Sequence, residues 1–405
     1  MKNLLIAQSG GPTSVINATV AGIISIAYLS EKIDKIYGAV NGIEGVLKKR
    51  FIDIKEKLKI PEDIELLCQT PAAALGSCRF KLNAEDSKQL EKIISILREY
   101  EIKYFLYIGG NDSMDTVDKL CKYCEKNKID DIRIVGIPKT IDNDLEFIDH
   151  CPGFGTAAKY ISIIFKELER DCKVYSTKGI TVVEVMGRNA GWLTAASVLA
   201  KSSNNDGPDL IYLPEKIFKK EKFIADIKEK FKNKNNLLIA VSEGIKNENG
   251  KYISENIQLE DTDIFGHKKT AGAGKILEKI IRDEFKCKVR AIEINLLQRC
   301  SAHIQSSTDV NEAKLLGMKG VLGVVEGKSG VMASLKRKKG TEYDVEFEFV
   351  PVSEVANKEK KVPKNFINPE GNFVTLEMID YLKPLIRGEQ KIIYEEGTPK
   401  HIKLY

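Results

Sequence analysis

Residues 134–144 read IVGIPKTIDND, an apolar run that passes into a polar segment at Pro138. An apolar run that ends at a proline predicts a buried strand followed by a loop. In an open parallel sheet, ligands bind at the loops that follow the carboxyl ends of the strands. This loop carries Lys139, a threonine hydroxyl, and the carboxylates of Asp142 and Asp144. A base for a hydroxyl proton, a metal-capable carboxylate and a cation for phosphate charge together indicate phosphoryl transfer to an alcohol.

The segments on either side of this stretch alternate between strand and helix patterns up to about residue 300. Near-continuously apolar strands separated by amphipathic helices predict an α/β fold with parallel, doubly wound sheets. A length of 405 residues accommodates two such sheets, and we expect a cleft between them. The expected strands are 4–8, 35–40, 104–108, 133–137, 180–185, 210–213, 237–241 and 291–297, and the expected helices are 87–100, 115–127, 156–171, 221–232 and 311–316.

The composition narrows the classes of function. A net charge of +5 from 63 basic and 58 acidic residues does not favour a nucleic-acid binder, which concentrates basic residues on one face. We find no signal peptide, and no apolar run approaches the roughly 20 residues that span a bilayer. The eight cysteines are scattered, and the single CxxC pair, Cys121 and Cys124, lacks a second Cys/His pair at zinc spacing. We expect a cytoplasmic enzyme with reduced thiols.

Two glycine-containing loops each follow an expected strand and precede a helix. Gly10 and Gly11 allow backbone N–H groups to approach an anion, although a plain strand–helix turn is an equal alternative. The second loop, GGNDS at residues 109–113, adds the metal-capable side chains of Asn111 and Asp112, and Asp112 could equally cap the helix. Together with the loop at Lys139, they indicate a phosphate site with a metal. The chain has no Walker A motif and no complete GxGxxG after a strand, which disfavours P-loop kinases and dinucleotide dehydrogenases.

Further polar residues follow the later strands. Arg188 could bind a sugar phosphate or lie solvated on the surface, and Glu243 could accept sugar hydroxyls. Arg290 and Arg299 bracket the last expected strand of the series. A guanidinium binds phosphate through two parallel N–H groups, so this pair of arginines is a weak indication of a phosphate site.

Taken in order, these motifs resemble the phosphofructokinase family from about residue 4 to residue 320. The resemblance implies two Rossmann-like αβα domains with fructose 6-phosphate in the cleft between them. It also implies a Mg2+-dependent phosphorylation of the sugar's 1-hydroxyl, a step of glycolysis. The markers are GGPTSVINA at 10–18, GSCR at 76–79, GGNDS at 109–113, PKTIDND at 138–144, EVMGRNAGW at 184–192, SEG at 242–244 and RAIEINLLQR at 290–299.

The resemblance assigns roles to individual residues. The implied catalytic residues are Asp142, which would accept the hydroxyl proton, Lys139 and Asp112. The residues implied to bind diphosphate are Gly10, Gly11 and Arg79, and those implied to hold Mg2+ are Asn111 and Asp144. The residues implied to bind the sugar phosphate are Thr140, Ile141, Asp142, Met186, Gly187, Arg188, Glu243, Arg290, Leu296, Leu297, Gln298 and Arg299. Arg290 resembles a ligand lent by a neighbouring subunit, so we expect a homodimer or homotetramer.

Two residues bear on the phosphoryl donor. ATP-using bacterial members usually carry glycine where this chain has Asp112 and Lys139, whereas pyrophosphate-using members resemble it at both positions. A carboxylate about 4 Å from an ATP phosphate would repel it by roughly 4 kcal/mol at an effective dielectric near 20. We therefore expect pyrophosphate as the donor. The alternatives are an ATP-dependent member of the family and a catalytically weak regulatory homologue that binds sugar phosphate.

The resemblance also implies a division of labour along the chain, and the chain departs from the usual pattern at three positions. Residues 1–145 would bind the donor and Mg2+, residues 146–305 would bind fructose 6-phosphate, and residues 306–405 would pack back on both domains. Asn111 stands where most members have an acidic magnesium ligand, and Leu296 replaces a histidine or tyrosine often found against the sugar. The third position is Gly179, where ATP-dependent members carry a cross-subunit arginine.

Overall fold

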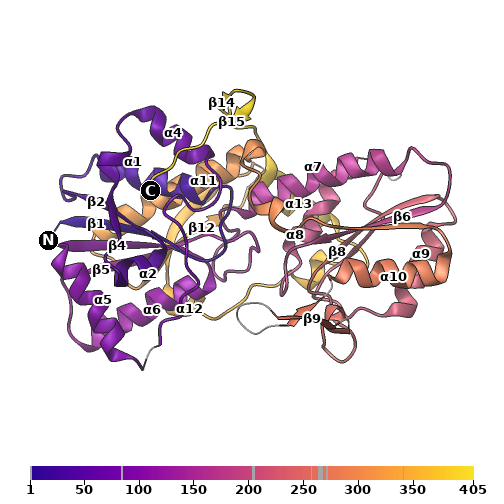
Figure 1. The fold of residues 1–405 in the computed structure, drawn as a ribbon, viewed down its shortest axis with the longest axis horizontal. Coiled ribbons are helices and arrows are strands. Elements are labelled where there is room, and N and C mark those ends of the chain that lie inside the picture. The colour runs from indigo at the N-terminus through magenta and orange to yellow at the C-terminus, as the bar shows by residue number, and fades with distance from the viewer. Residues whose placement is uncertain are drawn as a thin grey trace. The chain divides into compact units, whose positions relative to one another are not determined.

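A computed structural model describes residues 2–83, 85–202, 206–256, 258–262, 268–270, 272–340 and 342–405. The chain divides into two compact units (Figure 1). Unit 1 comprises Met1–Thr156, Arg299–Glu359 and Ile386–Tyr405, and unit 2 comprises Ala157–Gln298 and Lys360–Leu385. The C-terminal hundred or so residues are therefore shared between both units, and the chain crosses from one unit to the other four times.

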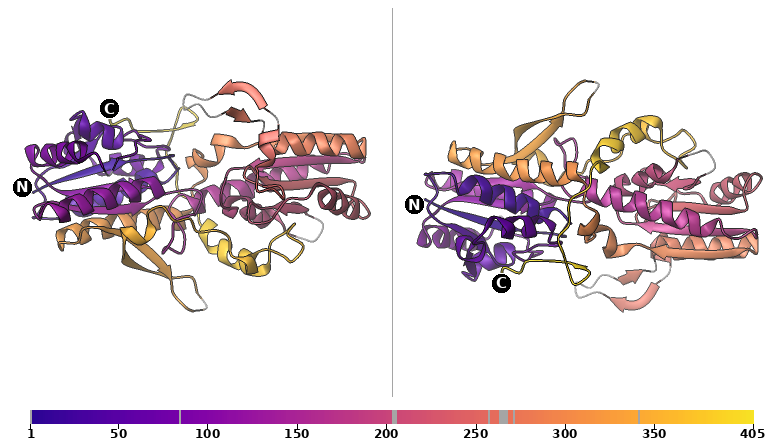
Figure 2. Two further views of the ribbon diagram at one scale, coloured as in Figure 1. Left: turned by 90° about the horizontal axis from the view of Figure 1, so that it is seen from below. Right: turned by 90° about the horizontal axis from the view of Figure 1, so that it is seen from above.

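Unit 1 is built on a seven-stranded sheet of order β13-β12-β5-β4-β1-β2-β3. Its inner strands run parallel, and only the edge strands β3 and β13 are antiparallel to their neighbours. The inner strands are almost wholly buried, because helices cover both faces of the sheet (Figure 2). The strands are β1 (Asn3–Gln8), β2 (Ile36–Ala39), β3 (Phe51–Asp53), β4 (Ile102–Gly109), β5 (Arg133–Pro138), β12 (Val331–Arg337) and β13 (Val345–Pro351).

Unit 2 is built on a smaller, wholly parallel sheet of order β11-β6-β8-β7. One face packs on two helices, where Phe223 and Leu277 contact strand residues such as Ile239. The strands are β6 (Gly179–Val185), β7 (Leu210–Tyr212), β8 (Asn236–Ser242) and β11 (Lys288–Glu293), with the pair β9 (Gln258–Thr262) and β10 (Lys268–Thr270) outside the sheet. The prediction of an α/β fold with two parallel sheets and helices on their faces is thus confirmed.

Each of the five expected helices has a counterpart in the structure, which also contains helices that were not expected. Unit 1 contains α1 (Ile16–Ala27), α2 (Gly42–Leu47), α3 (Ile54–Lys57), α4 (Pro61–Gln69), α5 (Ser87–Glu99), α6 (Asn111–Lys126), η4 (Ala302–Ile304), α11 (Ser307–Val325) and α12 (Val352–Val355), and the short pair β14 (Tyr394–Glu395) and β15 (Thr398–Pro399). Unit 2 contains all or most of α7 (Phe154–Cys172), α8 (Trp192–Ala196), η1 (Ser197–Ala200), α9 (Lys220–Lys230), η2 (Ile253–Asn256), α10 (Ala273–Phe285), η3 (Asn295–Arg299), η5 (Lys364–Phe366), α13 (Leu376–Leu382) and η6 (Lys383–Ile386). Among the helices of the described residues, none is long and apolar enough to cross a membrane.

Three expectations about element bounds were wrong. The helix expected at 311–316 is much longer, because α11 runs from Ser307 to Val325. The expected strand 291–297 is displaced: β11 ends at Glu293, and the next residues form the 3-10 helix η3. Asn295 has φ 50°, a left-handed conformation that breaks the strand there. The second glycine loop, expected at 109–113, is shorter than predicted. It ends at Gly110, which is the N-cap of α6, and the helix starts at Asn111. Asp112 therefore lies in the first helical turn and does not cap the helix.

Candidate active site

The backbone between β1 and α1 forms a tight turn that we call the Gly10 loop, residues 9–11. Gly10 has φ +76°, a conformation that side chains with a Cβ rarely adopt. The Gly10 N–H donates to the Cys78 carbonyl at 3.1 Å, and the Ser77 hydroxyl donates to the Gly10 carbonyl at 2.6 Å. The markers at 10–18 and 76–79, which lie far apart in the sequence, are therefore hydrogen-bonded neighbours.

The ammonium group of Lys139 lies directly behind the Gly10 loop. Lys139 follows β5, is 2% exposed, and donates from Nζ to the Ser9 carbonyl at 2.9 Å and to the Gly11 carbonyl at 2.6 Å. Burial lowers the pKa of Lys139 to about 8, with the charges of Asp142 and Asp144 opposing that effect. A large fraction of Lys139 is therefore charged at neutral pH, and the loop presents an anion site with a buried cation beneath it.

Two arginines add positive charge to the anion site at the Gly10 loop. A Cβ placed on Gly11 would lie 3.0 Å from Nη1 of Arg299, so the guanidinium approaches the loop closely. Burial lowers the pKa of Arg299, and the charge of Arg79 lowers it further, which places the two guanidinium groups within electrostatic reach. The structure brings Arg299 together with Gly11 and Arg79 in unit 1. The expected role of Arg299 in binding the sugar phosphate stays a prediction.

The carboxylates Asp142 and Asp144 lie on a segment that we call the acidic loop, residues 139–153. The loop closes on itself, since the Thr140 N–H donates to the Pro152 carbonyl at 3.2 Å and the buried Asn143 amide accepts from the Cys151 N–H at 2.9 Å. Asn143 is left-handed, with φ 55°. The Asp142 N–H donates to the Thr140 hydroxyl at 3.1 Å. The backbone that carries both carboxylates is thus fixed before any ligand binds.

Residues of α11 and β12 form hydrogen bonds to the acidic loop and to the start of α7. The carboxylate of the buried Asp309 accepts from the Gly153 N–H at 2.9 Å and from the Thr156 N–H at 2.7 Å. The Ser334 hydroxyl donates to the Phe147 carbonyl at 2.6 Å. Burial raises the pKa of Asp309 to about 6, and the N–H donors oppose that rise. The C-terminal part of unit 1 therefore supports the predicted catalytic segment.

A buried charged network adds to this support. His150 is 2% exposed and lies 2.8 Å from Asp149 and 2.6 Å from Glu312 through its two ring nitrogens. Burial alone would lower the pKa of His150, but Glu312 and Asp149 together raise it to about 9. Tyr343 donates to Glu312 at 2.5 Å, and Arg337 donates to Asp149 at 3.0 Å. His150 is therefore a charged anchor of the acidic loop at neutral pH.

The two polar residues at the start of α6 differ in their surroundings. The Asn111 amide accepts from the Asn357 N–H at 2.5 Å and donates to the Lys358 carbonyl, so both of its ends hold the chain after α12. The side chain of Asp112 is 74% exposed and pairs with Lys81 at 3.4 Å.

Within the part of the chain that the structure describes, no three His, Cys, Asp or Glu residues gather as a metal cluster. A Mg2+ ion usually takes one or two carboxylates plus substrate phosphates, so Asp144 fits such a role better than Asn111.

Unit 2 assembles a second group of predicted residues past the carboxyl ends of β6 and β8. Gly187 has φ +125° and sits where a Cβ would collide with the Ala190 carbonyl. The Glu243 carboxylate accepts from the Gly187 N–H at 3.1 Å, and the Ser242 hydroxyl donates to the Gly187 carbonyl at 2.6 Å. The buried Gln298 accepts from the Met186 N–H at 3.2 Å. Polar side chains thus fix the backbone of 186–188 from two sides.

The remaining predicted side chains of unit 2 are exposed. Arg188 stacks on the Tyr252 ring, with 4.8 Å from its guanidinium carbon to the ring centroid. Leu296 and Leu297 are 54% and 57% exposed on η3. Burial raises the pKa of Glu243, and the nearby Arg188 charge partly offsets that rise.

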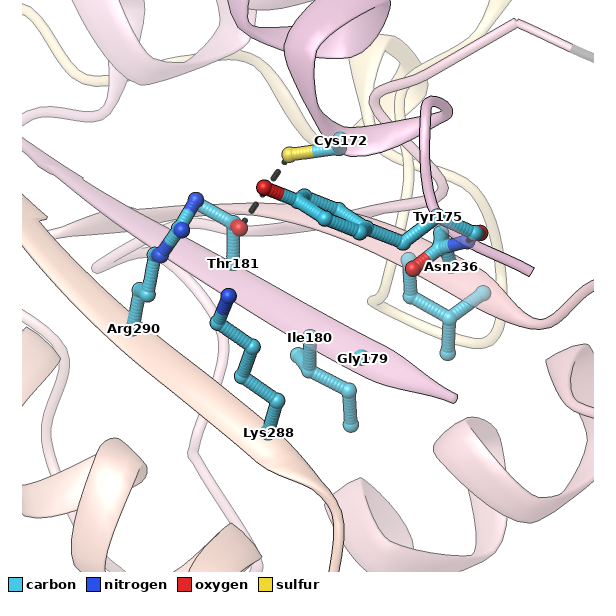
Figure 3. A pocket seen from close by; sticks show the side chains of 9 residues that line it. Cys172, Tyr175, Gly179, Ile180, Thr181, Asn236, Lys288 and Arg290 are labelled. Atoms are coloured by element: carbon cyan, nitrogen blue, oxygen red, sulfur yellow. Dashed lines mark hydrogen bonds between the residues drawn. The ribbon is translucent and has the colours of Figure 1, made fainter. Parts of the chain in front are cut away.

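Arg290 stands apart from this second group. It lines a small pocket with Lys288, Cys172 and Tyr175 near the amino ends of β6, β8 and β11 (Figure 3). It pairs in register with Thr181, five residues before Met186, which is about 16 Å along a strand at 3.3 Å per residue. Its nearest charged partner in the chain is Asp171, at 3.4 Å. Arg290 therefore lies too far from Met186 and Gly187 to share a small ligand with them within one chain.

Several residues that shape the site carried no recognisable signal in the sequence. Lys81, which pairs with Asp112, and Asp309, His150 and Glu312, which anchor the acidic loop, come from segments without a motif. Their partners lie up to about 160 residues away in the sequence. Helix and strand periodicity relates only residues that are close in sequence, so it could not predict these pairs. The strands and helices of the fold bring them together.

Comparison with known proteins identifies the family to which the chain belongs. A family description named Phosphofructokinase matches residues 3–323. The chain belongs to the phosphofructokinase family. It is 37% identical over 408 residues to the pyrophosphate–fructose 6-phosphate 1-phosphotransferase of Methylococcus capsulatus, covering 100% of this chain and 96% of that protein. It is 38% identical to the enzyme of that name from Xanthomonas campestris, covering 99% of this chain and 96% of that one.

Solved structures of the family give the same result for the fold. The crystal structure of a pyrophosphate-dependent phosphofructokinase from Marinobacter aquaeolei superposes with a TM-score of 0.89 at 35% identity, covering 100% of this chain and 97% of that one. A second such phosphofructokinase, from Nitrosospira multiformis, superposes with a TM-score of 0.90 at 36% identity, covering 100% and 96% of the two chains. The resemblance noted in the sequence is thus confirmed at the level of the phosphofructokinase fold.

Proposed function

We propose that this protein transfers a phosphoryl group reversibly from diphosphate to the 1-hydroxyl of D-fructose 6-phosphate. The products are D-fructose 1,6-bisphosphate and phosphate. The enzymes named above from M. capsulatus and X. campestris carry pyrophosphate and fructose 6-phosphate in their names. Phosphofructokinase membership together with this full-length similarity supports the proposal.

The observation that carries the choice of donor is the buried Lys139 beneath the Gly10 loop. Lys139 donates to two carbonyls of that loop, which fixes its ammonium group without a ligand. A preorganised cation stabilises charge that develops on a phosphate without reorganising during the reaction. Diphosphate lacks the base and ribose through which ATP gains contacts, so it depends more on such a fixed cation.

In the proposed reaction, the carboxylate of Asp142 accepts the proton of the 1-hydroxyl. The hydroxyl oxygen forms a bond to the transferred phosphorus as the bond from phosphorus to the leaving phosphate breaks. Lys139, Arg79 and Arg299 stabilise the negative charge of the donor and of the leaving phosphate. Met186, Gly187, Arg188 and Glu243 hold the sugar phosphate on unit 2, with Thr140 and Ile141 beside the base on unit 1.

The proposal includes Mg2+ and an oligomer. Asp144 would hold Mg2+ together with oxygens of the diphosphate, and the ion would neutralise charge on the transferred group. Arg290 would act on the sugar phosphate of a neighbouring subunit, since within its own chain it lies about 16 Å along the strand from Met186. A cytoplasmic location stays a prediction.

Parallel assays of the purified protein with diphosphate and with ATP test the choice of donor. The expected result is fructose 1,6-bisphosphate formation with diphosphate at a kcat/KM at least tenfold above that with ATP. Turnover with ATP and none with diphosphate would reject diphosphate as the donor while keeping the phosphofructokinase reaction. Binding of fructose 6-phosphate without turnover from either donor would favour the regulatory alternative.

A further inference from the structure

The last fifteen residues of the chain pack on unit 1. Gln69, at the end of α4, donates to the carbonyls of Ile393 and Lys400 at 2.9 and 2.6 Å and accepts from the Ile393 N–H at 2.9 Å. The Ile402 N–H donates to the Thr70 hydroxyl at 3.0 Å. Leu404 is 1% exposed within the core of unit 1. We call residues 391–405 the tail, which runs in yellow past α4 in Figure 1.

The tail ends against the segment that connects α4 to the Gly10 loop. Gly76 has φ +69°, and a Cβ placed on it would lie 2.5 Å from the Tyr405 hydroxyl. The next three residues reach the anion site: the Ser77 hydroxyl and the Cys78 carbonyl bond to Gly10, and Arg79 follows. Tyr405 therefore contacts a segment whose neighbouring residues hold the Gly10 loop.

The segment 70–79 has no regular secondary structure and depends on side-chain bonds for its shape. The Ala74 N–H donates to Asn17 at 2.9 Å, and the Leu75 N–H donates to Gln8 at 2.8 Å. These two partners come from β1 and α1. Asn41, which precedes α2, holds the segment further along: its N–H donates to the Leu75 carbonyl at 2.8 Å, and its side-chain amide donates to the Ser77 carbonyl at 3.3 Å. At Gly76, one residue before the first bond to Gly10, the tail adds the Tyr405 hydroxyl beside the side-chain amide of Asn41.

We propose that the tail is a positioning element for the phosphoryl donor, with Tyr405 as a residue that, together with Asn41, orders 76–79 and so holds Gly10 and Arg79 for the anion. The inference rests on the proposed function only for the identity of the donor. The packing of the tail on unit 1 does not depend on that function. Loss of the tail contact loosens residues 76–79 and with them the Gly10 loop, so the affinity for diphosphate falls while fructose 6-phosphate binding in unit 2 is unchanged.

Two tyrosines of the tail offer a matched pair of variants. Tyr405 is 61% exposed and touches Gly76, whereas Tyr394 is 55% exposed in β14. We expect Tyr405→Ala to raise the KM for diphosphate about fivefold, with the KM for fructose 6-phosphate unchanged. Tyr394→Ala should leave both constants unchanged. Tyr405→Phe keeps the ring but loses the hydroxyl that approaches Gly76, so its diphosphate KM should lie between those of the wild type and Tyr405→Ala. Equal diphosphate KM values for Tyr405→Ala and Tyr394→Ala would overturn the inference.

Amide hydrogen exchange separates the tail contact from the identity of the donor. In Tyr405→Ala, but not in Tyr394→Ala, the amides of residues 76–79 and of Gly10 should exchange faster. Unchanged exchange would contradict the positioning role whatever the donor is. If the wild-type protein uses ATP and not diphosphate, the proposed function fails, and the same variants measured with ATP still decide the inference. Removal of Leu404 and Tyr405 is a second variant, and it should raise the donor KM further than Tyr405→Ala does.

Discussion

The Gly10 loop and acidic loop of unit 1 contrast with the 186–188 segment and η3 of unit 2. In unit 1 the cation Lys139 is buried and bonded to its own chain, and His150, Asp309 and Glu312 fix the backbone around the carboxylates. In unit 2 the backbone is fixed by Glu243 and Gln298, but Arg188, Arg290 and Leu296 present exposed side chains.

This difference indicates two modes of recognition. A buried, pre-bonded charge is arranged before a ligand arrives, which suits a small anion that offers few contacts of its own. Exposed side chains on a fixed backbone gain partners only when a larger ligand or another subunit arrives. The variants below test this contrast, beginning with the largest expected effect.

Asp142→Asn removes the proposed base and keeps the shape of the side chain. We expect kcat to fall about a thousandfold, because general-base catalysis contributes roughly 10²–10⁴-fold. Fructose 6-phosphate affinity, measured by calorimetry, should change less than about threefold. Glu146→Gln changes a carboxylate of the same acidic loop and serves as the control. A kcat within tenfold of the wild-type value would remove Asp142 from the role of base.

Arg290→Ala tests whether the exposed arginine acts on a neighbouring subunit. Arg290→Ala and Asp142→Asn homo-oligomers should both be nearly inactive. Their co-expressed mixture should recover about a quarter of wild-type activity for a dimer, because half of randomly mixed dimers are hybrids with one intact site. A mixture as inactive as its parents would show that Arg290 does not act between subunits. Sedimentation analysis of each sample checks that hybrids form.

Asp112→Gly tests the electrostatic exclusion of ATP. Since Asp112 is 74% exposed and paired with Lys81, a dielectric near that of water applies, and the repulsion at about 4 Å falls to roughly 1 kcal/mol. The KM for ATP, or its inhibition constant against diphosphate, should therefore fall only about fivefold. Lys81→Met should shift the same constant in the opposite direction. A thousandfold effect would mean that ligand binding buries Asp112.

The buried network around His150 predicts a modest pH effect on stability. The raised folded pKa of about 9 lies above the ordinary value near 6.5, so the charged His150 stabilises unit 1 fully below pH 6.5. That contribution is lost as the pH rises through 9. The melting temperature of the wild-type protein should exceed that of His150→Gln by about 3 °C more at pH 6.5 than at pH 10. Asp149, Glu312, Tyr343 and Arg337 surround His150 and stay unchanged in the comparison. A pH-independent difference would argue against a charged His150.

Some features of the fold and the site could be predicted from the sequence, and others could not. Apart from the short edge strand β3, which was not expected, the strands up to β8 were predicted to within a few residues, because their apolar runs are continuous and bounded by glycine or proline. The expected strand 291–297 was displaced, because the left-handed Asn295 ends β11 early and no pattern signals that turn. The sequence also left Asp112 open between a helix cap and a metal-side group, and the structure put Gly110 at the cap.

The sequence by itself determined the alternation of strands and helices and the family motifs, because periodicity and short colinear segments are local properties of a chain. It also named Lys139 and Asp142 from one stretch of eleven residues. Only the tertiary structure decided that Lys139 is buried beneath Gly10, that Arg299 joins Arg79, and that Tyr405 contacts Gly76. These relations join residues up to 329 positions apart. Burial and the pairing of charges depend on which elements meet, so the packing of the sheet and its helices sets them.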